Sequence, residues 1–117
     1  MFSTLAQVAL GGAIGSVLRF LSVQAVGAPV ATLVVNVVGS FAMGVLFVAL
    51  SARMQFAPLL MAGVLGGFTT FSAFSLDALK LWSTGQAAQA ALYVAASVAL
   101  SLAAVALGAA LAKGALG

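Results

Sequence analysis

The segment Gly66-Gly67-Phe68-Thr69-Thr70-Phe71-Ser72-Ala73-Phe74 interrupts the third of four long apolar runs in this chain. Its two glycines and its β-branched threonines are poor helix formers. Backbone at mid-membrane depth must satisfy its own N–H and C=O groups, because lipid offers no hydrogen-bond partner. Such a break is tolerated where it lines a cavity or holds an ion, as in the discontinuous helices of transport proteins. The alternative interpretation is a glycine-rich notch for helix packing.

The composition is that of an integral membrane protein. Of the 117 residues, 65% are hydrophobic and 4% are charged, whereas charged residues make up about a quarter of an ordinary soluble domain. The length allows one domain. A formal net charge of +3 is too small and too dispersed for a nucleic-acid partner. We therefore expect residues 1–117 to form a single membrane domain whose surroundings are the lipid bilayer.

The hydropathy pattern predicts an all-α membrane protein with four transmembrane helices, the third of them broken. Each apolar run has at least roughly 20 residues, the length that crosses about 30 Å of hydrocarbon. The predicted spans are 5–26, 30–50, 56–82 and 87–112.

The basic residues give no preferred orientation in the membrane. With four spans, Arg53 and Lys113 lie on one side, and Arg19 and Lys80 lie toward the other. The Lys/Arg asymmetry that normally fixes orientation is therefore missing, and a chain without it can insert both ways. Two oppositely inserted copies would be related by a two-fold axis in the membrane plane. The alternative is that one orientation prevails through subtler signals.

Small residues recur four positions apart, a spacing that lets helix backbones approach closely. A bundle of only four short spans has few faces to share between lipid and a polar lining, so a homodimer is the economical expectation. The spaced pairs are Gly11 with Gly15, Gly12 with Ser16, Ser40 with Gly44, and Gly63 with Gly67.

Three helix faces carry polar side chains inside the predicted spans. A single Ser or Thr in a membrane helix usually bonds its own i−4 carbonyl, but the amide of Asn36 is costly in lipid without a partner. Together the three faces predict a narrow polar track beside the broken helix. They comprise Thr32, Asn36, Gly39, Ser40 and Met43; Phe71, Phe74, Ser75 and Ala78 with Ser72 beside them; and Tyr93, Ser97, Ser101 and Gly108.

The chemistry of this track favours a small, strongly hydrated anion. It offers N–H and O–H donors, and the positive ring edges of Phe71 and Phe74 suit an anion, although two Phe at this spacing also serve simple packing. Arg19 either snorkels to the interface or draws anions into a vestibule. An enzyme is not expected: the chain has no His, Cys or Glu and a single acid, Asp77, so triads, paired carboxylates and side-chain metal sites have no residues to form them.

Three ordered motifs identify a family resemblance that covers essentially the whole chain. They are Gly11-Gly12-Ala13-Ile14-Gly15-Ser16-Val17-Leu18-Arg19-Phe20, Thr32-Leu33-Val34-Val35-Asn36-Val37-Val38-Gly39-Ser40-Phe41, and the broken segment from Gly66 to Phe74. The chain resembles the CrcB/Fluc family of microbial fluoride channels. The resemblance implies an antiparallel, dual-topology homodimer in the cell inner membrane that exports fluoride from the cytoplasm. It also implies a structural sodium ion on the two-fold axis.

The family's roles carry over to matching positions of this sequence. The carbonyls of Gly66 and Thr69 match those that hold sodium, and Arg19 matches the arginine of the first helix, here assigned to the vestibule. Two residues depart from the family pattern, Ala73 in place of a frequent Thr and Ala31 in place of a usual Gly, and each puts a local packing detail in doubt. The matched fluoride-pore residues are Asn36, Phe71, Phe74, Thr32, Ser72, Ser75, Ser97 and Ser101.

A sodium site also agrees with elementary coordination chemistry. Two carbonyls from each of two antiparallel chains give about four oxygens, which suit a hard monovalent cation. The competing account is that water or the hydroxyls of Thr69 and Thr70 satisfy these carbonyls. For the function, the alternatives are a small dual-topology multidrug or cation antiporter, for which the usual first-helix carboxylate is missing, and an accessory subunit, which leaves the polar faces unexplained.

Overall fold

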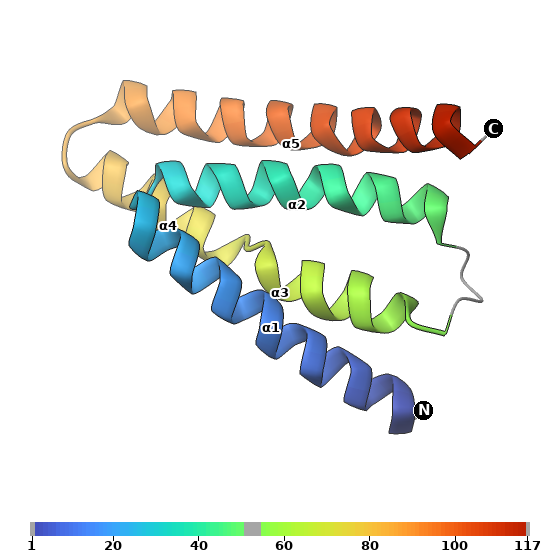
Figure 1. Ribbon diagram of the computed structural model, residues 1–117. Helices are drawn as coiled ribbons and strands as arrows, with labels where there is room; N and C mark the ends of the chain where they lie inside the picture. The colour runs from blue at the N-terminus through green and yellow to red at the C-terminus, as the bar shows by residue number, and fades with distance from the viewer. Residues whose placement is uncertain (1, 51–54, 117) are drawn as a thin grey trace.

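The chain folds into a bundle of helices, and the computed structural model describes residues 2–50 and 55–116. Within these residues, α-helices and one π-helix form four stretches long and apolar enough to cross a membrane, which confirms the predicted all-α class with four spans (Figure 1). The elements are α1 (Phe2–Val26), α2 (Val30–Ala49), η1 (Pro58–Leu65), α3 (Gly66–Phe68), α4 (Ser72–Ser83) and α5 (Ala87–Leu116).

The spans lie side by side and are joined by tight turns. Gly27 and Gly85 adopt φ angles of 88° and 80°, a conformation that glycine adopts without steric cost, and each ends the preceding helix. In Figure 1, α2 runs between α5 and the third span, while α1 crosses the third span obliquely. The third span therefore has α1 on one side and the α2–α5 pair on the other.

The third span is broken, as the sequence predicts. Its first part, η1, is a π-helix that begins at Pro58, and α3 adds one α-helical turn that ends at Phe68. Thr69 is extended, with φ −84° and ψ 157°, and α4 begins at Ser72. π-helical turns occur frequently at functional sites. The π-helix and the extended residue therefore indicate that the functional site lies in this part of the chain.

Glycines let two pairs of helices meet backbone to backbone. A Cβ added to Gly11 of α1 would lie 2.8 Å from the Cα of Gly63 in η1, and a Cβ on Gly67 would lie 2.7 Å from the carbonyl oxygen of Gly12. A Cβ on Gly44 of α2 would lie 2.9 Å from the backbone nitrogen of Ala109 in α5. These small residues, predicted for close packing, hold helices together within one chain.

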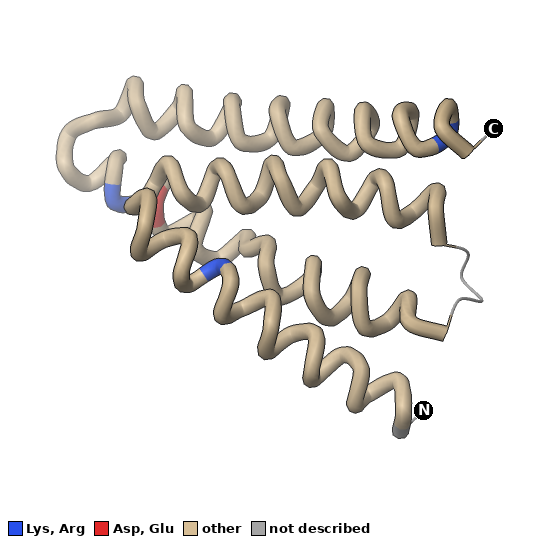
Figure 2. Tube along the Cα trace, viewed as in Figure 1, with Lys and Arg blue, Asp and Glu red and all other residues tan. Residues whose placement is uncertain are grey.

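The outer surface is apolar and poor in charge. Large side chains such as Leu10, Phe47 and Leu92 are more than half exposed, as expected where the surrounding medium is lipid. Figure 2 shows that the charged positions of the described chain are few and scattered along the bundle. This surface supports a multi-pass membrane protein.

Candidate functional site

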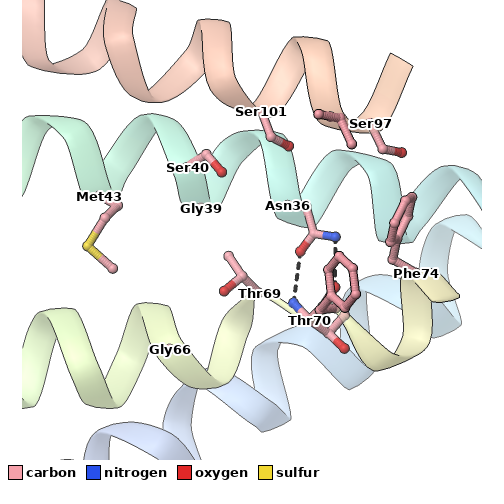
Figure 3. Close-up of a pocket in the computed structure, with 12 residues that line it drawn as sticks. Asn36, Gly39, Ser40, Met43, Gly66, Thr69, Thr70, Phe74, Ser97 and Ser101 are labelled. Atoms are coloured by element: carbon pink, nitrogen blue, oxygen red, sulfur yellow. Dashed lines mark hydrogen bonds between the residues drawn. The ribbon is translucent and has the colours of Figure 1, made fainter. Parts of the chain in front are cut away.

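A pocket of about 460 Å³ lies where α2 and α5 face the break in the third span (Figure 3). The break brings residues of α3, the extended segment and α4 against the polar faces of α2 and α5. The pocket is lined by Asn36, Gly39, Ser40, Met43, Gly66, Thr69, Thr70, Phe71, Phe74, Ser97, Val98 and Ser101.

The amide of Asn36 is paired with the backbone of Thr70. The N–H of Thr70 donates to Oδ1 of Asn36 at 2.8 Å, and Nδ2 of Asn36 donates to the carbonyl oxygen of Thr70 at 2.9 Å. This reciprocal pairing also fixes which end of the amide carries the N–H groups. Asn36 therefore supplies the extended backbone with the donor and acceptor that the helix no longer provides.

Two carbonyls of the break lose their usual helical donors to side chains. In a regular helix the N–H of Thr70 would bond the carbonyl of Gly66, and the N–H of Ala73 would bond that of Thr69. Here the Thr70 N–H donates to Asn36, and the Ala73 N–H donates to Oγ1 of Thr70 at 3.1 Å. Gly66 and Thr69 both line the pocket, and the diversion of their donors fits the assignment of their carbonyls to a cation.

Phe71 and Phe74 form one wall of the pocket, and the ring of Tyr93 packs behind Phe74. The ring centroids of Phe71 and Phe74 are 5.4 Å apart with the planes tilted by 52°, and those of Phe74 and Tyr93 are 5.3 Å apart at 40°. Phe74 is buried, whereas Phe71 is 77% exposed. Tilted pairs such as these present ring edges, which carry the positive end of the aromatic quadrupole.

Helix α5 contributes two hydroxyls at the positions that the sequence predicts. Ser97 and Ser101 lie one turn apart and both line the pocket. Ser97 is 5% exposed, and its Oγ has no hydrogen-bond partner in the described part of the chain. A buried hydroxyl without a partner is rare. The hydroxyl of Ser97 can therefore donate a hydrogen bond to a ligand in the pocket.

Three other predicted pore residues do not line this pocket. Thr32 is 1% exposed and lies one helical turn before Asn36. Ser75 donates its hydroxyl to the carbonyl of Phe71 at 2.9 Å, which is the local i−4 bond common for serine in membrane helices. Ser72 is exposed, with its Oγ 3.4 Å from Oγ1 of Thr70.

The predicted vestibule residue, Arg19, bonds the break from the side of α1. Its Nε donates to the carbonyl oxygen of Gly67 at 3.1 Å, and the side chain is half-buried. It does not line the pocket that contains Asn36. Arg19 and Asn36 thus hold the broken segment from opposite sides.

Sequence reasoning missed two parts of this region. Thr70, assigned no role beyond a possible hydroxyl for the carbonyls, bonds Asn36 through its backbone and caps the first turn of α4. Its position three residues before Ala73 is the available signal, since a threonine hydroxyl can accept from an N–H three positions on. Asp77 is 7% exposed and accepts a hydrogen bond from the Tyr93 hydroxyl at 3.2 Å. Its partner lies on another helix, so no local pattern reveals it.

Comparison with known proteins gives the family. A family model described as "CrcB-like protein, Camphor Resistance (CrcB)" matches residues 6–109, a stretch that includes every residue lining the pocket. The chain belongs to the CrcB family. Within that family, the CrcB chain described here is similar to proteins named "Fluoride-specific ion channel FluC".

Three of these relatives match at high coverage. The protein of Cereibacter sphaeroides is 55% identical over 121 residues, which cover 97% of this chain and 98% of the relative. That of Paracoccus denitrificans is 49% identical with the same coverage. That of Rhizobium etli is 54% identical over 109 residues, covering 84% of this CrcB chain and 86% of the relative.

Proposed function

We propose that this CrcB protein is a fluoride-selective ion channel that exports fluoride from the cytoplasm and so lowers its intracellular concentration. Its family membership and its similarity to proteins named as fluoride-specific channels support this function. The four membrane-spanning helices provide the setting, and we place the protein in the cell inner membrane. The activity is ion passage, and we assign no catalytic role to any residue.

The observation that carries the proposal is the composition of the pocket at the break. Its lining combines an amide, hydroxyls and two phenyl rings, and it contains no carboxylate and no basic side chain. An anion that loses its hydration water needs hydrogen-bond donors in place of that water. Ser97, Ser101 and the second N–H of Asn36 supply such donors. The ring edges of Phe71 and Phe74 add a weakly positive wall.

The functional unit that we propose is an antiparallel, dual-topology homodimer. Phe71 lines the pocket yet is largely exposed in the single chain, so the wall it forms is open on one side without a partner. The balanced distribution of Lys and Arg supports insertion in both orientations. Two opposed copies would place one polar pocket in each.

We further propose a structural sodium ion held by the carbonyls of Gly66 and Thr69 from both copies. The diverted hydrogen bonds of Thr70 and Ala73 support this assignment. When bound, such a cation would supply a fixed positive charge and would link the two copies through backbone carbonyls. The residues of this chain keep those two carbonyls oriented by bonding the break through Asn36 and Thr70.

A small multidrug or cation antiporter receives no support from the family match. An antiporter of that class exchanges its substrate for protons at a membrane-embedded carboxylate. The one acidic residue of this chain, Asp77, is hydrogen-bonded by Tyr93 and does not line the pocket.

Fluoride efflux from reconstituted vesicles tests the proposal. Purified protein in liposomes loaded with potassium fluoride should release fluoride to an external electrode once valinomycin relieves the charge imbalance. Liposomes loaded with potassium chloride should release far less anion through the same protein. Equal chloride release, or efflux no faster than from empty liposomes, would overturn the assignment, whereas proton-coupled cation flux would favour the antiporter.

A further inference from the structure

The guanidinium of Arg19 lies against the middle of the third span rather than in the pocket. Its Nε–H donates to the carbonyl oxygen of Gly67 at 3.1 Å, and Gly67 is in the single turn of α3 that precedes the break. The approach is close because a Cβ on Gly67 would lie 2.7 Å from the carbonyl oxygen of Gly12 and 3.2 Å from the nitrogen of Ser16. The position of Arg19 relative to α3 is thus set by backbone contact.

The carbonyls around the break are divided among different donors. Gly67 accepts from Arg19, and Thr70 accepts from Asn36. Phe71 accepts from the N–H and the hydroxyl of Ser75, both at 2.9 Å. The helical donors of the Gly66 and Thr69 carbonyls are diverted to side chains, and both residues line the pocket, whereas Phe68 between them does not.

Without a hydrogen-bond donor, the carbonyl of Gly67 would compete with that of Gly66 for the cation. The two carbonyls belong to consecutive peptides that share Gly67, and a glycine between two peptide planes lets them rotate more freely than other residues do. A donor fixed on Gly67 restricts that rotation. Asp77, the single acidic residue, accepts a hydrogen bond from Tyr93, and Arg19 donates to a backbone carbonyl.

We propose that Arg19 is a positioning residue for the sodium site, and that its Nε–H bond to Gly67 selects Gly66 and Thr69 as the carbonyls that face the cation. The inference rests on the proposed function and assigns Arg19 a role different from a vestibule charge. The property that matters is then the donor at the Nε position. The positive charge contributes to the cost of burying the side chain and not to the selection.

Three substitutions separate the donor from the charge. Arg19→Gln places an amide N–H at the same number of bonds from Cα as the Nε of arginine, without the charge. Arg19→Met has the same length with neither donor nor charge. Arg19→Lys keeps the charge but moves its donor one bond farther out.

The measurement is the sodium dependence of thermal unfolding in detergent, together with equilibrium binding of radioactive sodium and fluoride efflux. With Arg19→Gln, the apparent sodium affinity should stay within about threefold of the parent protein. With Arg19→Met, it should fall by roughly tenfold or more, the effect of losing one hydrogen bond to a carbonyl. If Arg19→Met does not fold, Arg19→Leu, which also lacks a donor and a charge, takes its place. A folded variant without a donor that keeps the sodium affinity of the parent would overturn the inference.

The opposite pattern overturns the inference. A tenfold loss of sodium affinity in Arg19→Gln, with Arg19→Lys like the parent, would show that charge is the required property. A parent protein whose stability does not respond to sodium would remove the cation site and this inference together. Absence of fluoride efflux from the parent is a separate result that overturns the proposed function.

Discussion

Asn36 on α2 and Thr70 in the extended segment exchange two hydrogen bonds, so one side chain replaces both partners that the backbone of Thr70 lost when the helix broke. The amide on α2 therefore has two possible tasks, to hold the break and to donate its remaining N–H to an ion. Both tasks need an N–H donor, and an ionised carboxylate at this position could only accept the bond from the Thr70 N–H.

We expect Asn36→Asp to reduce fluoride efflux by at least about tenfold. The substitution removes the donor to the Thr70 carbonyl and places a negative charge beside the pathway, and each change costs on the order of 1–3 kcal/mol. Gln24→Glu, the same chemical change on an exposed part of α1, should leave efflux near that of the parent. Efflux of Asn36→Asp equal to the parent, in protein that elutes normally from a sizing column, would remove Asn36 from the pathway.

The aromatic wall should act through ring edges rather than bulk. Phe71→Ile and Phe74→Ile keep apolar volume and lose the quadrupole, so each should lower fluoride efflux by roughly tenfold, on the scale of about 1.4 kcal/mol. Phe74→Ile should also lower the melting temperature, since Phe74 is buried within its own chain. Phe47→Ile, an exposed position on α2 outside the pocket, serves as the control. Parent-like conduction by both pocket variants would contradict the ring-edge role.

Opposite insertion should respond to added charge. A chain carrying Ser51→Lys and Gln55→Lys should insert mainly one way, and a chain carrying Thr84→Lys and Gln86→Lys should insert the other way, because basic loops stay cytoplasmic. Each biased chain alone should lose fluoride efflux, and co-expression of the two should restore it. A C-terminal reporter measures the orientation. A parent chain whose reporter is active on one side alone would contradict dual topology.

Removal of sodium should lower both the thermal stability of the protein and its fluoride conduction. Replacing sodium on both sides with N-methylglucamine, which is too large for a four-oxygen shell, should lower the melting temperature and the rate of fluoride efflux together. Rigorously sodium-free protein that melts and conducts as before would indicate that water or a hydroxyl satisfies the carbonyls of Gly66 and Thr69.

Adjacent glycines on α1 should give opposite results. Gly11→Ala should destabilise the protein by about 1–3 kcal/mol, because the new Cβ would lie 2.8 Å from the Cα of Gly63. Gly12→Ala meets no atom within 4 Å and should be neutral or stabilise by up to about 1 kcal/mol through helix propensity. Thermal melting in detergent measures both. Equal effects would contradict the close contact between α1 and η1.

The sequence predicted the spans and the break because both depend on local chemistry. Long apolar runs require helices in lipid, and glycines beside β-branched residues disfavour one. Helical periodicity also placed Asn36, Ser97 and Ser101 on faces that meet in one pocket. Such information concerns single helices.

The remaining features depend on how helices meet, which periodicity does not reveal. Thr32 shares a face with Asn36 but lies a turn away from the pocket and is fully buried. Ser75 has a suitable position, yet its hydroxyl bonds its own helix. The pairing of Asn36 with a backbone, and of Arg19 with Gly67, joins segments 34 and 48 residues apart. Nothing near either residue in the sequence specifies that partner.

The glycine contacts described above divide the bundle into two closely packed pairs of helices. Within each of the two pairs, α1 with the third span and α2 with α5, the glycines bring one helix backbone into direct contact with the other. Between the two pairs, the third span is joined to α2 and α5 by hydrogen bonds of Asn36 with Thr70 and of Tyr93 with Asp77, and the Thr69 side chain packs against Gly39 of α2. Because side chains, and not two backbones, meet between the pairs, we expect lateral pressure from the bilayer to change the width of the pocket before it changes the packing inside either pair.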